Sequence, residues 1–419
     1  MSSNSSTIGK LSTLDLIFSV MDSPRAPLDF TLVLQLKNSP GLVALRAGAM
    51  SARNRYPTTG SYIHKKEWVR FPEPEDGLRL VSTFSDGDTT KAIEEFLDSS
   101  FDLRVQMPVQ QLLIMDESRR GAELVTRFHH AAADGLSSAM WLKHQLGVAY
   151  GHETPAIQVS RCEALSLRTT PSPAKRSQFA FRGPSDRLWT SNARPSGARR
   201  WLTIGVAATD LRTACRRTGG FTYNDLLATC ALEVFTQWNR ARGDMRKLKI
   251  GLWLPVNVRQ QSSVGFGNGS SRIRLYARYA DKASLVDKCR EVRRQVSWSG
   301  QHGEWFVPQD NPLESLPLWA ITPLLRCYLN RPGLDMATGV FSHAEGWGGA
   351  NGESFREVEK IECVGLLHPQ QYVAINGATH RGQTWLTFTY DPAMLSRDDI
   401  QQLSEMYQDQ IAVARRELT

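Results

Sequence analysis

The residues best suited to chemistry lie within nine consecutive positions, residues 127–135, which read Arg-Phe-His-His-Ala-Ala-Ala-Asp-Gly. Two adjacent histidines, His129 and His130, lie in its first half, and Asp134 and Gly135 close it. Adjacent side chains of an extended chain point to opposite sides, so the two histidines are not expected to do the same job. A histidine near its ordinary pKa can take a proton at neutral pH. The spacing therefore predicts one general base in this segment.

Three interpretations of this segment compete. In the simplest, the histidines end a strand and Asp134 only caps the following helix. In the second, His129 or His130 binds a metal ion together with Asp134, although a metal site needs three or four converging ligands and the neighbouring sequence offers no His-Glu-x-x-His. In the third, one histidine deprotonates a nucleophile, and this is the interpretation that we follow.

The third interpretation agrees with a family resemblance. The His-His-x-x-x-Asp-Gly pattern of residues 129–135 resembles the signature of the coenzyme-A-dependent acyltransferase superfamily. That superfamily includes condensation domains, wax ester synthase/diacylglycerol acyltransferases and polyketide-associated acyltransferases. Further stretches are similar to segments of these enzymes: Leu-Ser-Thr-Leu-Asp at 11–15, Phe-Asp at 101–102, and Pro-Val-Asn-Val-Arg at 255–259 followed by Gly-Asn at 267–268. The resemblance covers nearly the whole chain.

The resemblance implies a role for each residue of the segment. His130, the second histidine, matches the general base that activates a hydroxyl or amine for attack on a thioester. Asp134 matches a residue that shapes the loop through an ion pair with an arginine, for which Arg259 is the candidate. Gly135 would let the loop pack closely, and His129 would serve packing or hydrogen bonding.

A glycine-rich segment at residues 342–349 carries further candidates. Related enzymes have Asp-Phe-Gly-Trp-Gly or Ser-Asn there, whereas this chain has Ser-His and then Gly-Trp-Gly. The segment is either a loop without a special role or part of the site. The candidates for contacting substrate or stabilising an oxyanion are Asn257, Asn268, Ser342, His343 and Trp347.

The fold implied by the resemblance is α/β, with two chloramphenicol-acetyltransferase-like lobes in a V-shaped arrangement around a central channel. We expect an N-terminal lobe at 1–160, a basic crossover linker at 161–198 and a C-terminal lobe at 199–419. The implied activity is acyl transfer from acyl-coenzyme A or an acyl carrier protein to the hydroxyl or amine of a small molecule, without a covalent intermediate. Two alternatives stay open. One is a condensation-like enzyme that forms an amide or catalyses dehydration or cyclisation on a carrier-bound substrate, and the other is a non-catalytic relative that binds a carrier protein.

Hydrophobic patterning predicts strands and helices in both halves of the chain. Strands are expected at 30–36, 62–71, 109–115, 123–129, 200–206, 248–256, 272–279, 358–365, 371–378 and 384–390. Helices are expected at 42–56, 88–97, 136–150, 224–240, 283–296, 314–329 and 397–415. The candidate base therefore lies where a strand ends and a helix begins, a place where rigid elements fix a side chain.

Composition agrees with this chemistry. The 419 residues carry 50 Lys and Arg against 42 Asp and Glu, a net charge of +8 that suits an anionic donor but falls short of a nucleic-acid-binding tail. The basic stretch at 175–200 is the expected contact for that donor. The six cysteines form no Cys-x-x-Cys pair, and we expect no metal and no permanently bound cofactor, only the thioester as co-substrate. A polar N-terminus, and no apolar run near the roughly 20 residues of a membrane span, predict a cytoplasmic protein, with peripheral membrane contact left open. We also expect a monomer.

Overall fold

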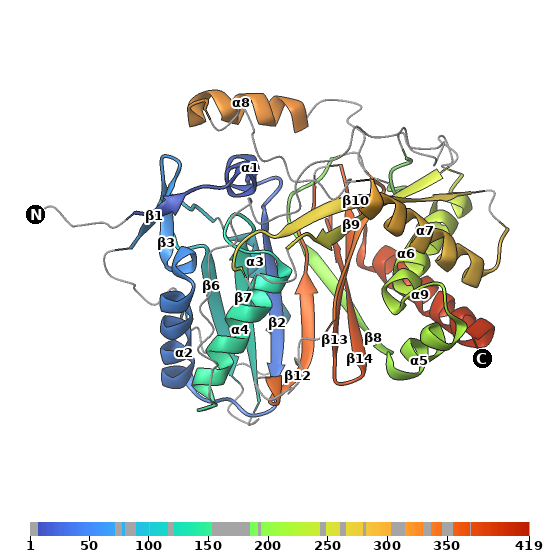
Figure 1. Cartoon of the computed structure of the whole chain (residues 1–419), viewed down its shortest axis with the longest axis horizontal. Coiled ribbons are helices and arrows are strands. Elements are labelled where there is room, and N and C mark those ends of the chain that lie inside the picture. The colour runs from blue at the N-terminus through green and yellow to red at the C-terminus, as the bar shows by residue number, and fades with distance from the viewer. Residues whose placement is uncertain are drawn as a thin grey trace, which may run out of the picture.

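The computed structural model describes residues 7–71, 78–79, 89–99, 101–115, 121–152, 185–191, 194–243, 249–259, 265–279, 282–302, 315–329, 337–345, 355–368 and 370–418. Within these ranges the strands form three sheets, and helices cover the two larger ones (Figure 1). No helix in the same ranges is long and apolar enough to cross a membrane.

The first half of the chain builds most of a five-stranded sheet. Its strand order is β12-β2-β7-β6-β5, and all neighbours are antiparallel except β5 and β6. The strands are β2 (Asp29–Leu36), β5 (Leu78–Arg79), β6 (Val109–Met115), β7 (Ala122–His129) and β12 (Val358–Val364). A separate three-stranded sheet, in the order β1-β4-β3, holds β1 (Thr7–Lys10), β3 (Ser61–His64) and β4 (Glu67–Arg70).

Helices cover both faces of the five-stranded sheet. The helices α2 (Leu42–Arg55) and α4 (Gly135–Ala149) pack on each other and on one face of the sheet. The helix α3 (Thr89–Asp98) packs on the opposite face. Because side chains of a strand alternate between faces, β7 sends Leu124 into the first core and Val125 into the second.

The second half of the chain builds a six-stranded sheet in the order β10-β9-β11-β13-β14-β8. Its strands are β8 (Arg200–Ala207), β9 (Lys249–Asn257), β10 (Ser270–Arg278), β11 (Gly339–Ala344), β13 (Val373–His380) and β14 (Gln383–Tyr390). The strand β11 runs parallel to both of its neighbours, β9 and β13, whereas the other pairs are antiparallel.

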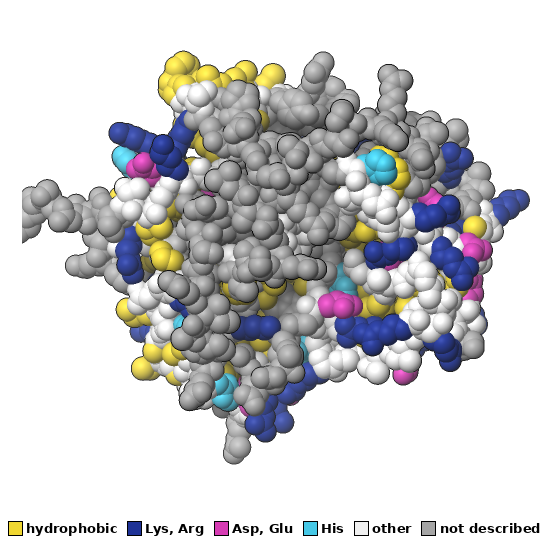
Figure 2. Space-filling model, viewed as in Figure 1, with side chains coloured by type: hydrophobic (Ala, Val, Ile, Leu, Met, Phe, Trp, Pro, Cys, Tyr) yellow, Lys and Arg dark blue, Asp and Glu magenta, His cyan; other side chains and the backbone are white. Residues whose placement is uncertain are grey.

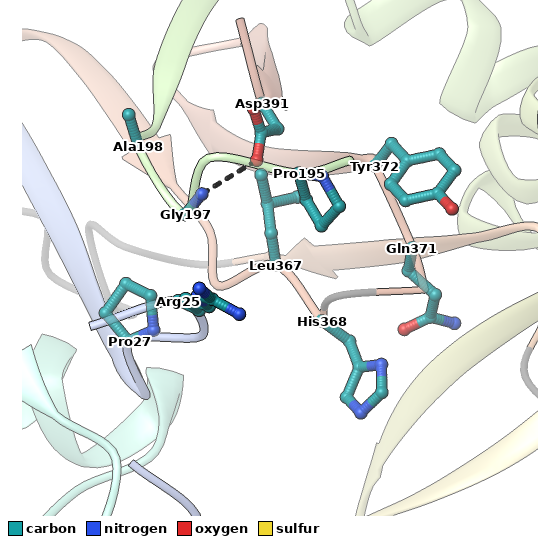
Figure 3. A pocket seen from close by; sticks show the side chains of 10 residues that line it. All are labelled: Arg25, Pro27, Pro195, Gly197, Ala198, Leu367, His368, Gln371, Tyr372 and Asp391. Carbon is teal, nitrogen blue, oxygen red and sulfur yellow. Dashed lines mark hydrogen bonds between the residues drawn. The ribbon is translucent and has the colours of Figure 1, made fainter. Parts of the chain in front are cut away.

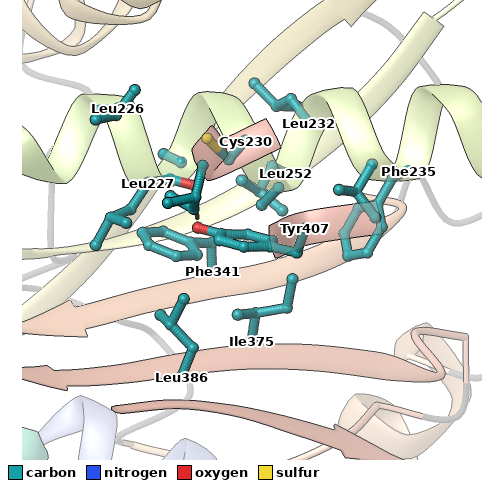
Figure 4. Close-up of a cluster of buried hydrophobic side chains, with 14 of the residues drawn as sticks. Leu226, Leu227, Cys230, Leu232, Phe235, Leu252, Phe341, Ile375, Leu386 and Tyr407 are labelled. Atoms are coloured by element: carbon teal, nitrogen blue, oxygen red, sulfur yellow. Dashed lines mark hydrogen bonds between the residues drawn. The ribbon is translucent and has the colours of Figure 1, made fainter. Parts of the chain in front are cut away.

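Four helices pack around one large core with this sheet: α5 (Thr209–Thr218), α6 (Tyr223–Ala241), α7 (Leu285–Gln301) and α9 (Arg397–Leu418). Figure 4 shows part of that core, in which Leu227 of α6, Phe341 of β11 and Tyr407 of α9 lie close together. The Tyr407 hydroxyl donates a hydrogen bond to the Leu227 carbonyl at 2.7 Å, so this polar group is satisfied inside the core.

Two helices lie at the periphery, where α1 (Thr13–Met21) and α8 (Leu318–Leu329) pack on each other (Figure 1). A capping box between Ser12 and Asp15 begins α1. A short 3₁₀ helix, η1 (Pro57–Gly60), follows α2.

The two halves of the chain interlock. The strand β12 belongs by sequence to the second half, but it pairs with β2 at the edge of the five-stranded sheet. Phe266, from the connection between β9 and β10, packs in the same core as α2 and α4. These two segments of the second half of the chain therefore contribute to the N-terminal sheet and its core. The lobe boundaries expected along the sequence stay a prediction.

Most expected elements are present within a few residues of their predicted positions, and the mixed α/β class is confirmed. Residues 62–71 differ, because they form the hairpin of β3 and β4 instead of one strand, with Lys65 at φ 56° in the turn. The structure also contains α1 and α5, for which the sequence analysis predicts no helix. The strand β11 includes residues 342–344, part of the expected glycine-rich loop.

Candidate active site

The predicted base lies in a tight turn between β7 and α4. The strand ends at His129 and the helix begins at Gly135. Asp134 is the N-cap of α4, and its carboxylate accepts a hydrogen bond at 3.0 Å from a backbone amide of the first helical turn. The His130 amide donates to the Leu28 carbonyl at 2.8 Å, which ties the turn to the residue before β2.

Asn268 fixes the orientation and the tautomer of the His130 ring. The side-chain nitrogen of Asn268 donates to the carbonyls of His130 and Ala131, at 2.6 and 3.3 Å. The side-chain oxygen of Asn268 therefore faces His130 Nδ1, at 3.0 Å. Because an amide oxygen only accepts hydrogen bonds, Nδ1 carries the proton and Nε2 keeps its lone pair. Within the described residues Nε2 makes no hydrogen bond, so it is available as a base.

The His130 ring lies among aromatic side chains. Phe18 of α1 stacks on it with ring centres 4.2 Å apart, and Phe30 of β2 meets it edge-on at 5.4 Å. Burial lowers the pKa of His130 below its usual value, because a charged imidazolium is poorly solvated there. The nearby Asp134 carboxylate, a hydrogen bond to the backbone of His130 itself and the Asn268 hydrogen bond oppose this shift without cancelling it. His130 is therefore neutral at neutral pH, which is the state that accepts a proton.

Asp134 and Arg259 form a buried ion pair, as the resemblance implied. The guanidinium nitrogens Nη1 and Nη2 donate to Oδ2 and Oδ1 at 2.7 and 2.9 Å, and the Gly269 amide donates to Oδ2 at 2.8 Å. Burial by itself would raise the pKa of Asp134, but Arg259 and the backbone amides hold it below its usual value. Each carboxylate oxygen accepts two hydrogen bonds, which leaves no lone pair for a proton relay or a metal ion.

Arg259 is held by groups that the sequence analysis does not identify. Ser137 Oγ accepts a hydrogen bond from Arg259 Nη2 at 2.9 Å and donates to the Gly267 carbonyl at 2.8 Å. A β-carbon at Gly269 would lie 2.5 Å from Arg259 Cζ, so the guanidinium group fits only beside a glycine. Gly269 could have been suspected from the sequence, because it directly follows the Gly-Asn pair of the motif. For Ser137 the only signal in the sequence is its position three residues after Asp134, the helix N-cap.

The contacts of Gly135 and Asn268 differ from those expected for them. The expectation for Gly135 is close packing, but Gly135 is exposed and a β-carbon there would meet nothing within 4 Å. Asn268 is a candidate for binding the oxyanion, but its amide N–H groups already donate to two backbone carbonyls. The geometry makes Asn268 a positioning residue for His130.

His129 is buried, and its contacts agree with the packing and hydrogen-bonding role expected for it. Its amide donates to the Pro108 carbonyl at 2.8 Å, and its Nδ1 accepts from the Ala131 amide at 3.1 Å. The ring of Phe101 meets the imidazole edge-on at 5.4 Å.

Asn257 at the end of β9 is exposed, and its side-chain oxygen accepts from the backbone amide two residues later at 3.1 Å. No contact in the described part of the chain brings Asn257 to the His130 ring.

The described contacts of His343 are with residues outside this cluster. Ser342 and His343 belong to β11. His343 Nε2 forms a hydrogen bond with the Thr379 hydroxyl at 2.7 Å, and burial lowers the pKa of His343 to about 4. Its ring meets Tyr223 of α6 edge-on, so the described contacts of His343 belong to the C-terminal core. Trp347 lies outside the described residues.

The basic crossover is described only in its last part, since residues 153–184 lie outside the described ranges. Arg199 Nη2 lies 2.6 Å from Asp29 Oδ1, and Arg127 Nε lies 2.7 Å from the same oxygen, with all three side chains buried. Arg200 pairs with Asp98 of α3 at 3.0 Å. These two arginines are therefore already paired within the protein, and the contact of the basic stretch with an anionic donor stays a prediction.

A small pocket opens beside the crossover (Figure 3). The residues that line it are Arg25, Pro27, Pro195, Gly197, Ala198, Leu367, His368, Gln371, Tyr372 and Asp391. One wall is fixed by Asp391, which accepts a hydrogen bond from the Gly197 amide at 2.9 Å. The lining residues differ from those around His130, so this pocket is not the candidate active site.

Comparison with known proteins shows the fold. No family model matches the sequence, and no curated protein matches it. Solved structures do match. The first condensation domain of the CDA synthetase is 13% identical with a TM-score of 0.70, over 98% of this chain and 97% of that one. Polyketide synthase associated protein 5 from Mycobacterium tuberculosis is 15% identical with a TM-score of 0.64, over 99% and 100%.

A third match extends the comparison to a polyketide synthase. The condensation domain of the Monacolin K polyketide synthase MokA is 10% identical with a TM-score of 0.69, over 99% of this chain and 98% of that one. At these identities the likeness concerns the fold, and it includes nearly the full length of each chain. The chain therefore has the two-lobed α/β fold that is seen in these condensation domains.

Proposed function

We propose that this protein is an acyltransferase in which His130 is the general base. The observation that carries the proposal is the contact between His130 and Asn268, which places the ring proton on Nδ1 and leaves the Nε2 lone pair unbonded within the described residues. A neutral imidazole held in one tautomer is arranged for proton abstraction. The ion pair of Asp134 and Arg259 supports the turn that carries His130.

The proposed reaction is direct transfer. Nε2 of His130 takes the proton of the acceptor hydroxyl or amine as that group attacks the thioester carbonyl carbon. The C–S bond of the resulting tetrahedral intermediate then breaks, and the proton passes from Nε2 to the leaving sulfur. The Asp134 charge and the Asn268 oxygen favour the transient imidazolium, because both raise the His130 pKa against the effect of burial. A positioned base of this kind contributes about 10²–10⁴-fold in rate.

The proposed donor is an acyl thioester on coenzyme A or on the phosphopantetheine arm of a carrier protein. Two observations support an anionic donor: the net charge of +8, and the likeness to condensation domains of a synthetase and of a polyketide synthase. The proposed acceptor is the hydroxyl or amine of a small molecule. The match to a cyclization-docking bidomain makes cyclisation on a carrier-bound substrate the second candidate reaction.

A donor and acceptor screen tests the proposal. Acyl-coenzyme A and acyl-carrier protein donors are each combined with alcohol and amine acceptors, and the product masses identify transfer, amide formation, dehydration or cyclisation. We expect His130→Ala to lower kcat by about 10²–10⁴-fold, while circular dichroism shows an unchanged fold. The matched control is His64→Ala, which removes an exposed histidine of β3.

Three outcomes would contradict the proposal. Activity of His130→Ala near that of the wild type would remove His130 from the role of base. An added acyl mass on the protein after incubation with donor alone would show a covalent intermediate and rule out direct transfer. Carrier-protein binding without a product in any combination would favour the non-catalytic alternative.

A further inference from the structure

The helix α8 is apolar on the side that faces the protein. Its residues Leu318, Ile321 and Leu325 pack with Leu16 and Val20 of α1 in a small core of their own. This packing holds α8 on the outside of the molecule, where Figure 1 shows it lying along the upper edge above α1. The buried side of α8 therefore explains how the helix is attached to the rest of the protein.

The outer side of α8 is apolar as well. The side chain of Trp319 is 80% exposed, Leu324 is 55% exposed, and Leu316, just before the helix, is 36% exposed. Cys327 continues the exposed series toward the end of the helix. We call Leu316, Trp319, Leu324 and Cys327 the α8 patch, and Figure 2 shows hydrophobic side chains gathered at the same upper edge. Such a run of exposed apolar residues on one peripheral helix marks an interaction surface.

Cations flank the α8 patch. Lys65 and Lys66 lie in the turn between β3 and β4, and the Lys66 ammonium donates to the Leu316 carbonyl, which places this turn beside the start of the patch. Arg326 is exposed on α8 itself. Glu67 lies opposite Lys10 in the register of β1 and β4, and its carboxylate accepts a hydrogen bond from the Thr7 hydroxyl at 3.5 Å. The patch therefore has a positively charged border.

We propose that the α8 patch docks the protein on an anionic lipid surface. The side chains of the α8 patch and of its border favour a bilayer over other occupants for two reasons. Indole and leucine side chains on a protruding helix suit the boundary between headgroups and acyl chains. Lys and Arg beside them are attracted to anionic headgroups, each adding a modest electrostatic gain. This inference concerns where the protein works and does not depend on the acyl-transfer proposal.

Vesicle sedimentation tests the inference. The full chain is mixed with vesicles of pure phosphatidylcholine and with vesicles that contain phosphatidylglycerol. We expect co-sedimentation with the anionic vesicles, at least about tenfold weaker binding to the neutral ones, and weakening in high salt. The double variant Trp319→Gln/Leu324→Gln should bind about tenfold more weakly than the wild type, because it removes the inserted apolar groups.

The matched control is Val43→Gln/Val105→Gln, which removes two exposed apolar side chains that lie outside α8. It should bind anionic vesicles like the wild type. Equal binding by the α8 variant and the wild type would overturn the inference, as would equal binding to neutral and anionic vesicles. A chain that stays in the supernatant with all vesicles, or that forms a dimer lost only in the α8 variant, would overturn it in favour of a protein partner or a second copy.

Discussion

At the scale of residues, the candidate site is a balance between an apolar setting and two polar contacts. Phe18 and Phe30 surround the His130 ring, and burial lowers its pKa. The Asn268 oxygen and the Asp134 charge act in the opposite direction. Burial keeps the ring neutral before proton transfer, and the two polar groups make the charged form accessible during transfer.

This balance predicts a specific effect for Asn268→Ala. Loss of the hydrogen bond at Nδ1 removes a group that raises the His130 pKa, so the pKa should fall further below its usual value. The acid limb of kcat/KM against pH, which falls where His130 becomes protonated, should therefore move to lower pH. The ring is also no longer held in one tautomer, and kcat should drop roughly tenfold to a hundredfold.

The pH profile of kcat/KM distinguishes an effect of Asn268 on the pKa of His130 from a purely structural role of Asn268. Asn54→Ala is the control, since Asn54 is exposed on α2 and its side-chain oxygen accepts from Arg70 at the surface. An Asn268→Ala variant with reduced kcat but an unmoved acid limb would mean that Asn268 supports the fold and does not set the state of His130.

At the scale of elements, the site forms where the turn between β7 and α4 meets the connection between β9 and β10. Asp134 lies on the first and Gly269 on the second, and the Arg259 guanidinium fills the space between them. Two elements more than 100 residues apart in sequence are therefore joined by one buried ion pair and the backbone amides around it.

The two glycines nearest this junction should respond differently to alanine. Gly269→Ala places a β-carbon 2.5 Å from Arg259 Cζ, and the resulting overpacking should cost about 1–3 kcal/mol of unfolding free energy and reduce kcat. Gly135→Ala meets nothing within 4 Å, and it should leave stability unchanged or raise it by about 0.4–1 kcal/mol. Urea unfolding of both variants measures the difference. Equal effects of the two substitutions would contradict this description of the junction.

The sequence predicts most elements because their hydrophobic periodicity is local. It also predicts His130, Asp134 and Arg259, since they belong to short motifs. It does not predict Asn268 as the partner of His130 or Gly269 as the partner of Arg259, because those contacts depend on how two distant segments meet. The pairing of β12 with β2 could not be predicted from the sequence for the same reason, because it joins two segments that are distant along the chain. The helix α5 is short and rich in arginine, so its apolar stripe is too narrow to stand out.

At the scale of the whole molecule, Asp29 joins the N-terminal sheet to the chain that leads into the C-terminal sheet. It is buried between Arg127 of β7 and Arg199, which directly precedes β8. Burial would raise the pKa of Asp29, but Arg199 and Arg127 together hold it well below its usual value. The charged carboxylate therefore contributes stability that depends on pH.

Asp29→Asn should lower the free energy of unfolding by about 3–5 kcal/mol at neutral pH, because two buried arginines lose their counter-ion. In the wild type the folded-state pKa lies below the unfolded one, so this stability is present above about pH 4 and is lost as the pH falls further. The variant should accordingly show a shallower loss of stability in acid.

Chemical unfolding at a series of pH values measures both effects. Asp409→Asn is the control, because Asp409 is exposed on α9 and the loss of an exposed carboxylate should have no measurable influence. Parallel pH dependences of the wild type and Asp29→Asn would contradict the role given to Asp29.

The position of β12 has a consequence for how the protein is made. Its partner β2 leaves the ribosome early, together with β6 and β7, but the edge of β2 that β12 covers has no partner until residue 364 has been synthesised. At a synthesis rate of about 5–20 residues per second, the interval between completion of α4 and completion of β12 lasts about 10–40 s. An uncovered strand edge is a template for pairing with other chains. The nascent protein is therefore most prone to aggregate during this interval, and ribosomes that stall between residues 150 and 357 should yield insoluble chains.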